Sequence, residues 1–268
     1  MKVAAIQMVS GTNCSINVQA VLESIAHAAE LGCELIALPE YFCLLGVRDT
    51  DKLAISEDFG HGPIQDAIRQ AARRHGVWIA AGTLPLKSMQ HDLVFNACLV
   101  FNPLGELAAR YDKMHLFAFD NGFERYDESR VLEAGTHPTS FEIASKDGYA
   151  WRIGISVCYD LRFPELYREL KADVLLVPSA FTYTTGQAHW ETLLRARAIE
   201  NLAYVIAPAQ GGIHENGRQT WGHSMIVNEW GQVLVQRASG EGLICAELDY
   251  PSMQRSRIQL PALSHRLL

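Results

Sequence analysis

The stretch from residue 152 to residue 165 changes its pattern sharply at a cysteine. Residues 153–157 alternate large apolar and small side chains, which is the period of a β-strand, and this strand runs directly into Cys158. Pro164 suits the first turn of a helix, which we expect to end near residue 171. An apolar run then predicts a second strand at 173–178. The chain therefore contains a strand–helix–strand unit with a cysteine on its first turn.

A thiol at this place in the chain has surroundings that favour its ionised form. Peptide N–H groups and the N-terminus of a helix lie near Cys158 in the predicted turn, and both favour a thiolate. The residue is a candidate nucleophile for that reason. A cysteine at the end of a strand is more often a small buried apolar side chain, and position alone leaves that structural role open.

Helix and strand patterns alternate along the rest of the chain. Helices are expected at 18–29, 63–75 and 189–202, and further strands at 1–8, 34–38, 77–82, 93–101, 106–111, 140–144, 204–209, 222–227, 232–236 and 243–248. Residues 113–138 lack periodicity and predict a long functional or mobile loop, and the basic tail beyond residue 251 is expected to wrap a neighbour or lie loose. Because strand–helix–strand units mix with antiparallel hairpins, we expect an α/β or α+β layered fold, as one domain over residues 1–268.

The overall composition excludes several classes of protein. A net charge of -7 and a pI near 5.8 argue against electrostatic binding to nucleic acid or to an anionic membrane. No apolar run approaches the length of a membrane span, and the N-terminus has a strand pattern instead of a signal peptide. Six cysteines without CxxC spacing indicate neither a disulfide framework nor a zinc site, and they favour the reducing cytoplasm. Neither metal-binding histidine spacings nor glycine-rich nucleotide motifs occur, so we expect no metal and no cofactor.

Two charged residues follow predicted strands as Cys158 does. Glu40 comes after an apolar strand, at the kind of carboxyl end where open α/β sheets place ligands, and Lys113 follows the strand that ends at residue 111. Each alone could be an ordinary solvated charge. Together with Cys158 they supply what the hydrolysis of an amide needs: a base for the thiol proton, a cation for the oxyanion and a sulfur that attacks the carbonyl.

Three segments of the chain resemble signatures of the carbon–nitrogen hydrolase (nitrilase) superfamily. They occur in the order of that family, at 38–42, 111–116 and 156–165. The resemblance covers nearly the whole chain, and three segments together are far more specific than any one of them. It implies an α-β-β-α sandwich that forms a homodimer. It also implies Glu40 as general base and acid, Lys113 as oxyanion stabiliser and Cys158 as nucleophile.

Two more residues acquire expected roles through the same resemblance. The backbone N–H of Tyr159 would be the second donor to the oxyanion. Glu128 matches a further carboxylate of the family, which would orient Lys113 or help to position the water. The alternative for Glu128 is an ordinary loop carboxylate in solvent.

Four residues are candidates for binding the substrate. Arg162 lies just past the cysteine and suits the binding of a substrate carboxylate, since its planar guanidinium pairs with carboxylates in a bidentate manner. The alternative for Arg162 is a structural salt bridge to Glu165 or Glu191. The residues that follow the strand at 173–178 are expected to line the pocket, and these are Phe181, Thr182 and Thr185.

Further segments resemble one branch of the superfamily, the deaminated glutathione amidases. They lie at 178–182, 185–186, 188–191, 194–200 and 221–225. The sister branch, the ω-amidases that act on α-ketoglutaramate, typically has Gly where this chain has Ser179. Nitrile-cleaving members tend to carry Trp-Glu after the cysteine, where this chain has Tyr159 and Asp160.

We therefore expect an amidase that acts on a small carboxylate-bearing amide through a thioester acyl-enzyme. Deaminated glutathione is the first candidate substrate and α-ketoglutaramate the second, with a nitrilase or carbamoylase of the same superfamily as a further alternative. The rival from another class is a non-catalytic binding protein, because a fold does not guarantee activity. A degenerate member would be expected to lack one of Glu40, Lys113 and Cys158, and none is missing.

Overall fold

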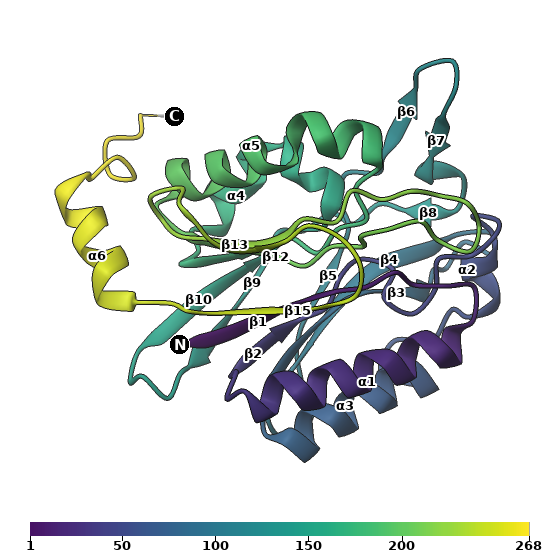
Figure 1. The fold of residues 1–268 in the computed structure, drawn as a ribbon, viewed down its shortest axis with the longest axis horizontal. Helices are drawn as coiled ribbons and strands as arrows, with labels where there is room; N and C mark the ends of the chain where they lie inside the picture. Colours follow the sequence, from purple (N-terminus) through teal and green to yellow (C-terminus); the bar gives the residue numbers. More distant parts are fainter. Residues whose placement is uncertain (268) are drawn as a thin grey trace.

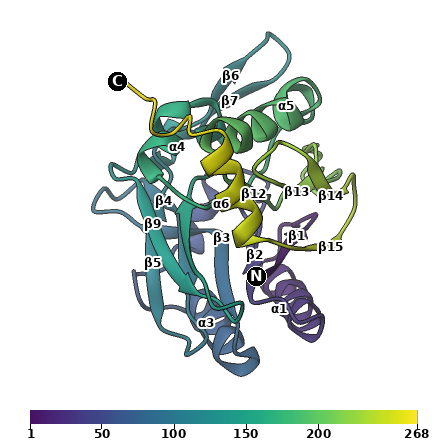
Figure 2. The same ribbon diagram turned by 90° about the vertical axis from the view of Figure 1, so that its left-hand side faces the viewer.

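Two β-sheets lie face to face between two pairs of helices in the computed structural model, which describes residues 1–267 (Figures 1 and 2). One helix pair covers the outer face of the first sheet, and the other covers the outer face of the second. The expected α-β-β-α sandwich is therefore confirmed. None of the helices in the described part of the chain is both long enough and apolar enough to cross a membrane.

The first sheet has seven strands, six of them in the order β15-β1-β2-β3-β4-β5, with β8 beside β4. Their bounds are β1 (Lys2–Gln7), β2 (Leu35–Ala37), β3 (Trp78–Lys87), β4 (Val94–Phe101), β5 (Leu107–Asp112), β8 (Leu132–Glu133) and β15 (Gly242–Glu247). Strands β1, β2 and β3 are parallel, whereas β3, β4 and β5 form an antiparallel meander. Polar residues that follow β2 and β5 can therefore meet near one end of the sheet.

The second sheet has six strands in the order β14-β13-β12-β11-β10-β9. Their bounds are β9 (Thr139–Ala144), β10 (Ala150–Ile155), β11 (Val174–Leu176), β12 (Tyr204–Ala207), β13 (Ser224–Val227) and β14 (Val233–Arg237). Strands β10, β11 and β12 are parallel, and β9 and β10 form the expected hairpin. The strand–helix–strand unit inferred around Cys158 thus lies in the middle of this sheet.

Successive side chains of the strands point to opposite faces of each sheet, so the core consists of two clusters. Ala4 and Ile6 of β1 face helices α1 (Cys14–Glu30) and α3 (Pro63–His75), whereas Val3 and Ala5 face the space between the sheets. The second sheet carries α4 (Pro164–Leu170) and α5 (Tyr183–Asn201) on its outer face. Short helices are α2 (Asp51–Ala54) and the 3₁₀ turns η1 (Glu128–Arg130) and η2 (Cys158–Arg162).

Two segments are more regular than the sequence predicts. Residues 113–138 contain a projecting hairpin, β6 (Ala118–Asp120) with β7 (Arg125–Asp127), followed by η1 and β8 (Figure 1). The tail beyond residue 251 is not loose along its whole length, because its first part belongs to α6 (Tyr250–Gln259). This helix buries Met253, and the guanidinium of Arg257 bonds Asp173 and the carbonyl oxygens of Ala172 and Leu202.

Candidate active site

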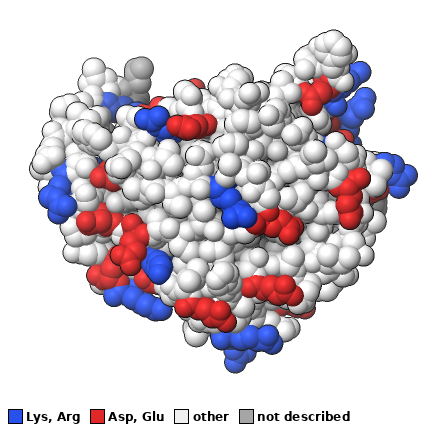
Figure 3. Space-filling view, viewed as in Figure 1, with Lys and Arg blue, Asp and Glu red and all other residues white. Residues whose placement is uncertain are grey.

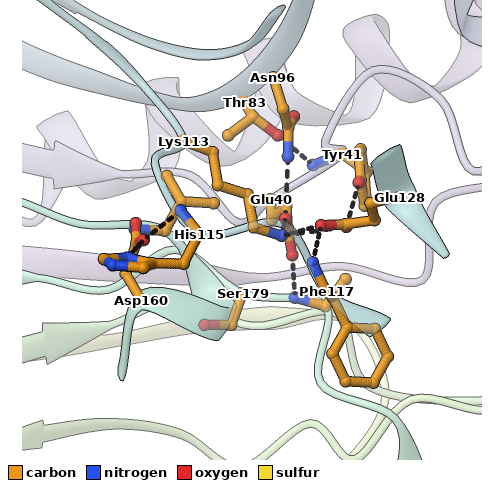
Figure 4. Close-up of polar contacts among 12 residues, drawn as sticks. Glu40, Tyr41, Thr83, Asn96, Lys113, His115, Phe117, Glu128, Asp160 and Ser179 are labelled. Carbon is orange, nitrogen blue, oxygen red and sulfur yellow. Dashed lines mark hydrogen bonds and ion pairs between the residues drawn. The ribbon is translucent and has the colours of Figure 1, made fainter. Parts of the chain in front are cut away.

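Glu40 and Cys158 follow two different strands and line one pocket, and Lys113, which follows a third strand, is buried against Glu40. Nζ of Lys113 lies 2.9 Å from Oε1 of Glu40, and both side chains are buried (Figure 4). Glu40 and Cys158 line the same pocket. The structure therefore brings together an acid, an ammonium group and a sulfur that lie far apart in the sequence.

Glu40 is held on both carboxylate oxygens. Oε1 accepts a 2.9 Å hydrogen bond from the Asn96 amide, and Oε2 accepts one of 2.9 Å from the Ala180 N–H. The turn before it is fixed by a close approach of backbones, because a Cβ on Gly82 would lie 1.9 Å from the carbonyl oxygen of Pro39. Only glycine fits there, and the position of the Glu40 turn depends on it.

Lys113 lies between two carboxylates. In addition to Glu40, its Nζ lies 2.7 Å from Oε2 of Glu128. Burial by itself would lower the pKa of Lys113, but the carboxylates of Glu128 and Glu40 outweigh burial and hold that pKa above its ordinary value. The side chain is therefore an ammonium ion throughout the neutral range, as an oxyanion stabiliser must be.

Glu128 is not a solvated loop carboxylate. Oε1 accepts a 2.8 Å hydrogen bond from the Tyr41 hydroxyl, and Oε2 accepts one of 2.7 Å from the Phe117 N–H (Figure 4). Burial opposes its ionisation, yet Lys113 and these hydrogen bonds keep the pKa of Glu128 below its ordinary value. The ionised carboxylate thus fixes the ammonium of Lys113, which lies between Glu128 and Glu40.

Cys158 has an unusual backbone conformation. Its φ of 50° lies in the left-handed region, which a non-glycine residue adopts at a cost, and Tyr41 next to Glu40 has a φ of 57°. The N–H of Cys158 donates to the carbonyl of Pro178 at 2.9 Å. Within residues 1–267, no acceptor is found for the N–H of Tyr159, so this donor is free to meet a ligand oxygen.

The surroundings of the sulfur oppose its ionisation. Burial raises the pKa of Cys158, and the negative charge of Glu40 raises it further, well above its ordinary value. Lys113 and the Ala180 N–H act in the opposite direction and do not compensate. These effects outweigh the thiolate-favouring N–H groups noted in the sequence, so an attack on a carbonyl requires a base beside the sulfur.

Asp160 joins the Cys158 turn to the segment after Lys113. Its Oδ2 accepts hydrogen bonds from the Tyr111 hydroxyl at 2.6 Å and from the Val157 N–H at 2.8 Å. Its Oδ1 accepts a 3.1 Å hydrogen bond from the His115 N–H and lies 2.7 Å from Nδ1 of the His115 ring. The carboxylate is fully buried. Asp160 is therefore a positioning residue for the turn.

The four residues that were expected to bind substrate, Arg162, Phe181, Thr182 and Thr185, all line the pocket, and so does Tyr159, whose backbone N–H is the expected oxyanion donor. The Arg162 guanidinium lies over the rings of Tyr159 and Phe181, at 5.8 and 5.6 Å from their centroids. Among residues 1–267 it makes no ion pair, so the alternative of a salt bridge to Glu165 or Glu191 is not found. This cation remains available to a ligand carboxylate.

Sequence reasoning missed four residues that line the pocket: Tyr41, Phe117, Ala180 and Arg218. Tyr41 adjoins Glu40 and could have been considered on that ground, but Arg218 comes from a loop without any helix or strand pattern. Conversely, Ser179 does not line the pocket, since its hydroxyl is buried and donates to the Val177 carbonyl. The Ser179 position therefore says little about the substrate.

Histidine, cysteine and carboxylate side chains do not gather elsewhere into a metal site. Within the described residues there is no group of three or more of them that could hold a metal ion. The chemistry available to the pocket is that of its own side chains and backbone N–H groups: a thiol, a carboxylate beside it and an ammonium ion next to that carboxylate.

Comparison with known proteins places the chain among hydrolases of carbon–nitrogen bonds. The family described as "Carbon-nitrogen hydrolase" matches residues 2–258. A deaminated glutathione amidase of Yersinia enterocolitica is 39% identical over 98% of this chain and 92% of its own length. The crystal structure of the C. elegans NitFhit protein superposes on 99% of this chain with a TM-score of 0.90 and 38% identity, and the match spans 65% of that longer protein. A Xanthomonas campestris structure, described as a CN-hydrolase superfamily protein with an arsenic adduct in the active site, has a TM-score of 0.84 at 30% identity, over 99% of this chain and 97% of its own.

Proposed function

The chain belongs to the carbon–nitrogen hydrolase family, and from that premise we propose that it is a cysteine-dependent amidase working through a thioester acyl-enzyme. The observation that carries this proposal is the contact between Lys113 and Glu40 at the pocket that contains Cys158. A buried ammonium–carboxylate pair beside the thiol supplies a base, an oxyanion stabiliser and a nucleophile.

In the first half of the proposed reaction, Glu40 takes the thiol proton while the sulfur of Cys158 attacks the amide carbonyl carbon. The ammonium of Lys113 and the free N–H of Tyr159 stabilise the oxyanion, and one such donor is worth about 3–4 kcal/mol in hydrolases. Glu40 then gives its proton to the departing nitrogen. The C–N bond breaks, an amine leaves and the acyl group remains on the sulfur as a thioester.

In the second half, a water molecule replaces the amine. Glu40 takes one proton from the water, the resulting hydroxide attacks the thioester carbonyl, and the proton returns to the sulfur as the acid leaves. Glu128 fixes Lys113, so that its ammonium points to the same oxyanion in both halves. We assign Glu128 this orienting role because its two oxygens are already occupied by Lys113, Tyr41 and Phe117.

The proposed substrate is a small amide with a carboxylate on its acyl part, and deaminated glutathione is the first candidate. Arg162 would bind the acyl carboxylate, with Thr182 and Thr185 as hydroxyl partners whose oxygens lie 2.8 Å apart. Support comes from the relatives that carry the name deaminated glutathione amidase. An ω-amidase acting on α-ketoglutaramate is the second candidate, because that molecule shares the acyl part.

The experiment that tests the proposal compares purified wild-type protein with a Cys158→Ala variant. Both are assayed with deaminated glutathione, α-ketoglutaramate, a nitrile and an N-carbamoyl amino acid. We expect wild-type turnover of the first or second, and none above background for the variant, while Cys14→Ser, which removes a half-buried thiol away from the pocket, keeps its activity. Folded wild-type protein that hydrolyses none of the four would favour a non-catalytic binding protein.

We further propose that the protein acts as a homodimer in the cytoplasm and does not bind nucleic acid. All six cysteines are free, which suits a reducing compartment. On the face shown in Figure 3, basic and acidic side chains are interspersed and form no basic patch. Light scattering of the purified protein tests the dimer, and a gel-shift assay with duplex DNA or RNA tests the absence of nucleic-acid binding.

A further inference from the structure

A second cavity adjoins the pocket that contains Cys158. The two cavities share the side chains of Tyr41, Phe117, Glu128 and Arg218. Cys158 and Arg162 line only the first cavity, whereas Lys52 and Tyr126 line only the second. A substrate held at the sulfur and extended past Glu128 would therefore enter the second cavity.

Arg218 stands where the two cavities meet, and its guanidinium has no protein partner within residues 1–267. Its Nε is buried and lacks a hydrogen-bond acceptor, and no ion pair of the described residues includes it. The guanidinium carbon lies 4.8 Å from the centroid of the Tyr126 ring. A buried charged donor without an acceptor destabilises the protein. A ligand oxygen that accepts a hydrogen bond from it would remove this cost, which favours binding.

The acids around the second cavity do not neutralise this arginine, because each has a cation of its own. The pairs are Asp49 with Lys52 at 3.8 Å, Asp127 with Arg130 at 3.7 Å, and Glu128 with Lys113 at 2.7 Å. Arg218 is thus the cation of this lining that is left without a counter-charge in the described part of the chain. The second cavity is arranged to accept one anionic group.

The loop that carries Arg218 is fixed to the rest of the chain. The Asn216 amide donates to the Gly46 carbonyl at 2.6 Å, and Nδ1 of His214 lies 2.9 Å from the Ser10 carbonyl oxygen. Oε2 of Glu215 accepts hydrogen bonds from the N–H and the hydroxyl of Thr12. A guanidinium on an anchored loop loses little freedom when it binds, which favours a preformed binding site.

We propose that Arg218 binds a carboxylate on the leaving-group side of the substrate, at the place where the two cavities meet. This inference rests on the proposed function, because it assumes that the C–N bond is cleaved at Cys158. Arg162 and Arg218 then divide the substrate between them, with the acyl carboxylate at the first and the amine's carboxylate at the second. A primary amide, which releases only ammonia, leaves Arg218 without such a carboxylate.

The test uses three amides with the same acyl part. The first is α-ketoglutaramate, which releases ammonia. The second is deaminated glutathione, which releases a dipeptide with a free carboxylate, and the third is the same compound with that carboxylate converted to a carboxamide. Wild-type protein is compared with Arg218→Met, with Arg218→Lys, and with the control Arg125→Met, which removes an exposed arginine of β7.

We expect Arg218→Met to lower kcat/KM for deaminated glutathione about 10- to 100-fold, the size expected for a lost charged hydrogen bond. The loss of kcat/KM on α-ketoglutaramate should be clearly smaller, because that amide has no carboxylate on its leaving-group side, and Arg218→Lys should recover part of the loss on deaminated glutathione. On the carboxamide, wild type and Arg218→Met should be equally slow. Arg125→Met should match wild type on all three.

Equal losses of Arg218→Met on the first two amides would overturn the leaving-group assignment, and so would a wild-type protein that does not discriminate deaminated glutathione from its carboxamide. Either result would leave the proposed amidase intact. A wild-type protein that hydrolyses none of the three amides would instead overturn the proposed function, and this inference with it.

Discussion

The hydroxyl of Tyr111 donates a 2.6 Å hydrogen bond to Oδ2 of Asp160, and this bond joins the strand that leads to Lys113 to the turn that carries Cys158. The same oxygen accepts the N–H of Val157, directly before the cysteine. The relative position of the ammonium and the sulfur therefore depends on one buried carboxylate that belongs to neither.

Replacing Tyr111 with Phe removes this bond and leaves Oδ2 of Asp160 with one donor fewer. We expect a loss of about 1–3 kcal/mol in the free energy of unfolding, which urea titration measures, and a fall in kcat larger than any change in KM. Tyr149→Phe is the control, because that ring is partly exposed and its hydroxyl makes no hydrogen bond with residues 1–267. A Tyr111→Phe protein with unchanged stability and kcat would show that the bond does not position the site.

Glu40 affects the sulfur in two opposite ways. Its charge raises the pKa of Cys158, so Glu40→Gln should lower that pKa and increase the thiolate fraction at any pH below it. Alkylation of Cys158 by iodoacetamide at pH 8, followed by peptide mass spectrometry, should therefore be faster in Glu40→Gln than in wild type. Amide hydrolysis should fall at least about 10²-fold in the same variant, because the base is lost. Slower alkylation would mean that Glu40 helps to ionise the resting thiol.

Glu128 should contribute to stability in a pH-dependent way. Because its pKa in the folded protein lies below its ordinary value, its contribution is present above about pH 4.5 and is lost as the pH falls through the folded pKa. Glu128→Gln should lower the free energy of unfolding at pH 7 by about 3 kcal/mol, and the difference from wild type should shrink between pH 5 and pH 3. Urea titrations at a series of pH values measure this difference. A difference that stays constant with pH would contradict the ionised pairing with Lys113.

The backbone of Gly82 packs closely against the turn that carries Glu40. An added methyl group would lie 1.9 Å from the Pro39 carbonyl oxygen, so Gly82→Ala should displace Glu40 and lower kcat by at least about 10-fold. Gly148→Ala is the control, since an added Cβ there meets no atom within 4 Å and only the positive φ of 86° is strained. Both kcat and Tm are measured for the two variants. Equal effects in both would show that the turn tolerates the methyl group.

Sequence signals at helix ends, such as a proline in the first turn and a glycine after the last, predicted helix bounds correctly where they occur. The helix expected at 63–75 is observed as α3, where Pro63 begins the first turn and Gly76 ends the helix with a φ of 62°. Helix α5 begins at Tyr183, six residues before the predicted start. The prediction missed these residues because they include Thr and Gly, which are poor helix formers. Packing compensates there, since Gly186 lies against Trp221.

The site was predictable as far as its residues lie in recognisable segments. Glu40, Lys113 and Cys158 each follow a strand, and the structure brings them together. The protonation of Cys158 was not predictable, because it depends on burial and on the charge of Glu40, which only the tertiary structure places beside the sulfur. Arg218 was missed for the same reason, because its place between two cavities is set by the tertiary structure.

The most direct test of the covalent mechanism is a partition experiment with hydroxylamine. Deaminated glutathione and α-ketoglutaramate share one acyl part, so a thioester on Cys158 would be the same intermediate from both. The ratio of hydroxamate to free acid, measured by mass spectrometry at a fixed hydroxylamine concentration, should be identical for the two substrates and independent of the leaving group. A ratio that changes with the leaving group, or hydroxamate formed by the Cys158→Ala variant, would contradict an acyl-enzyme on this cysteine.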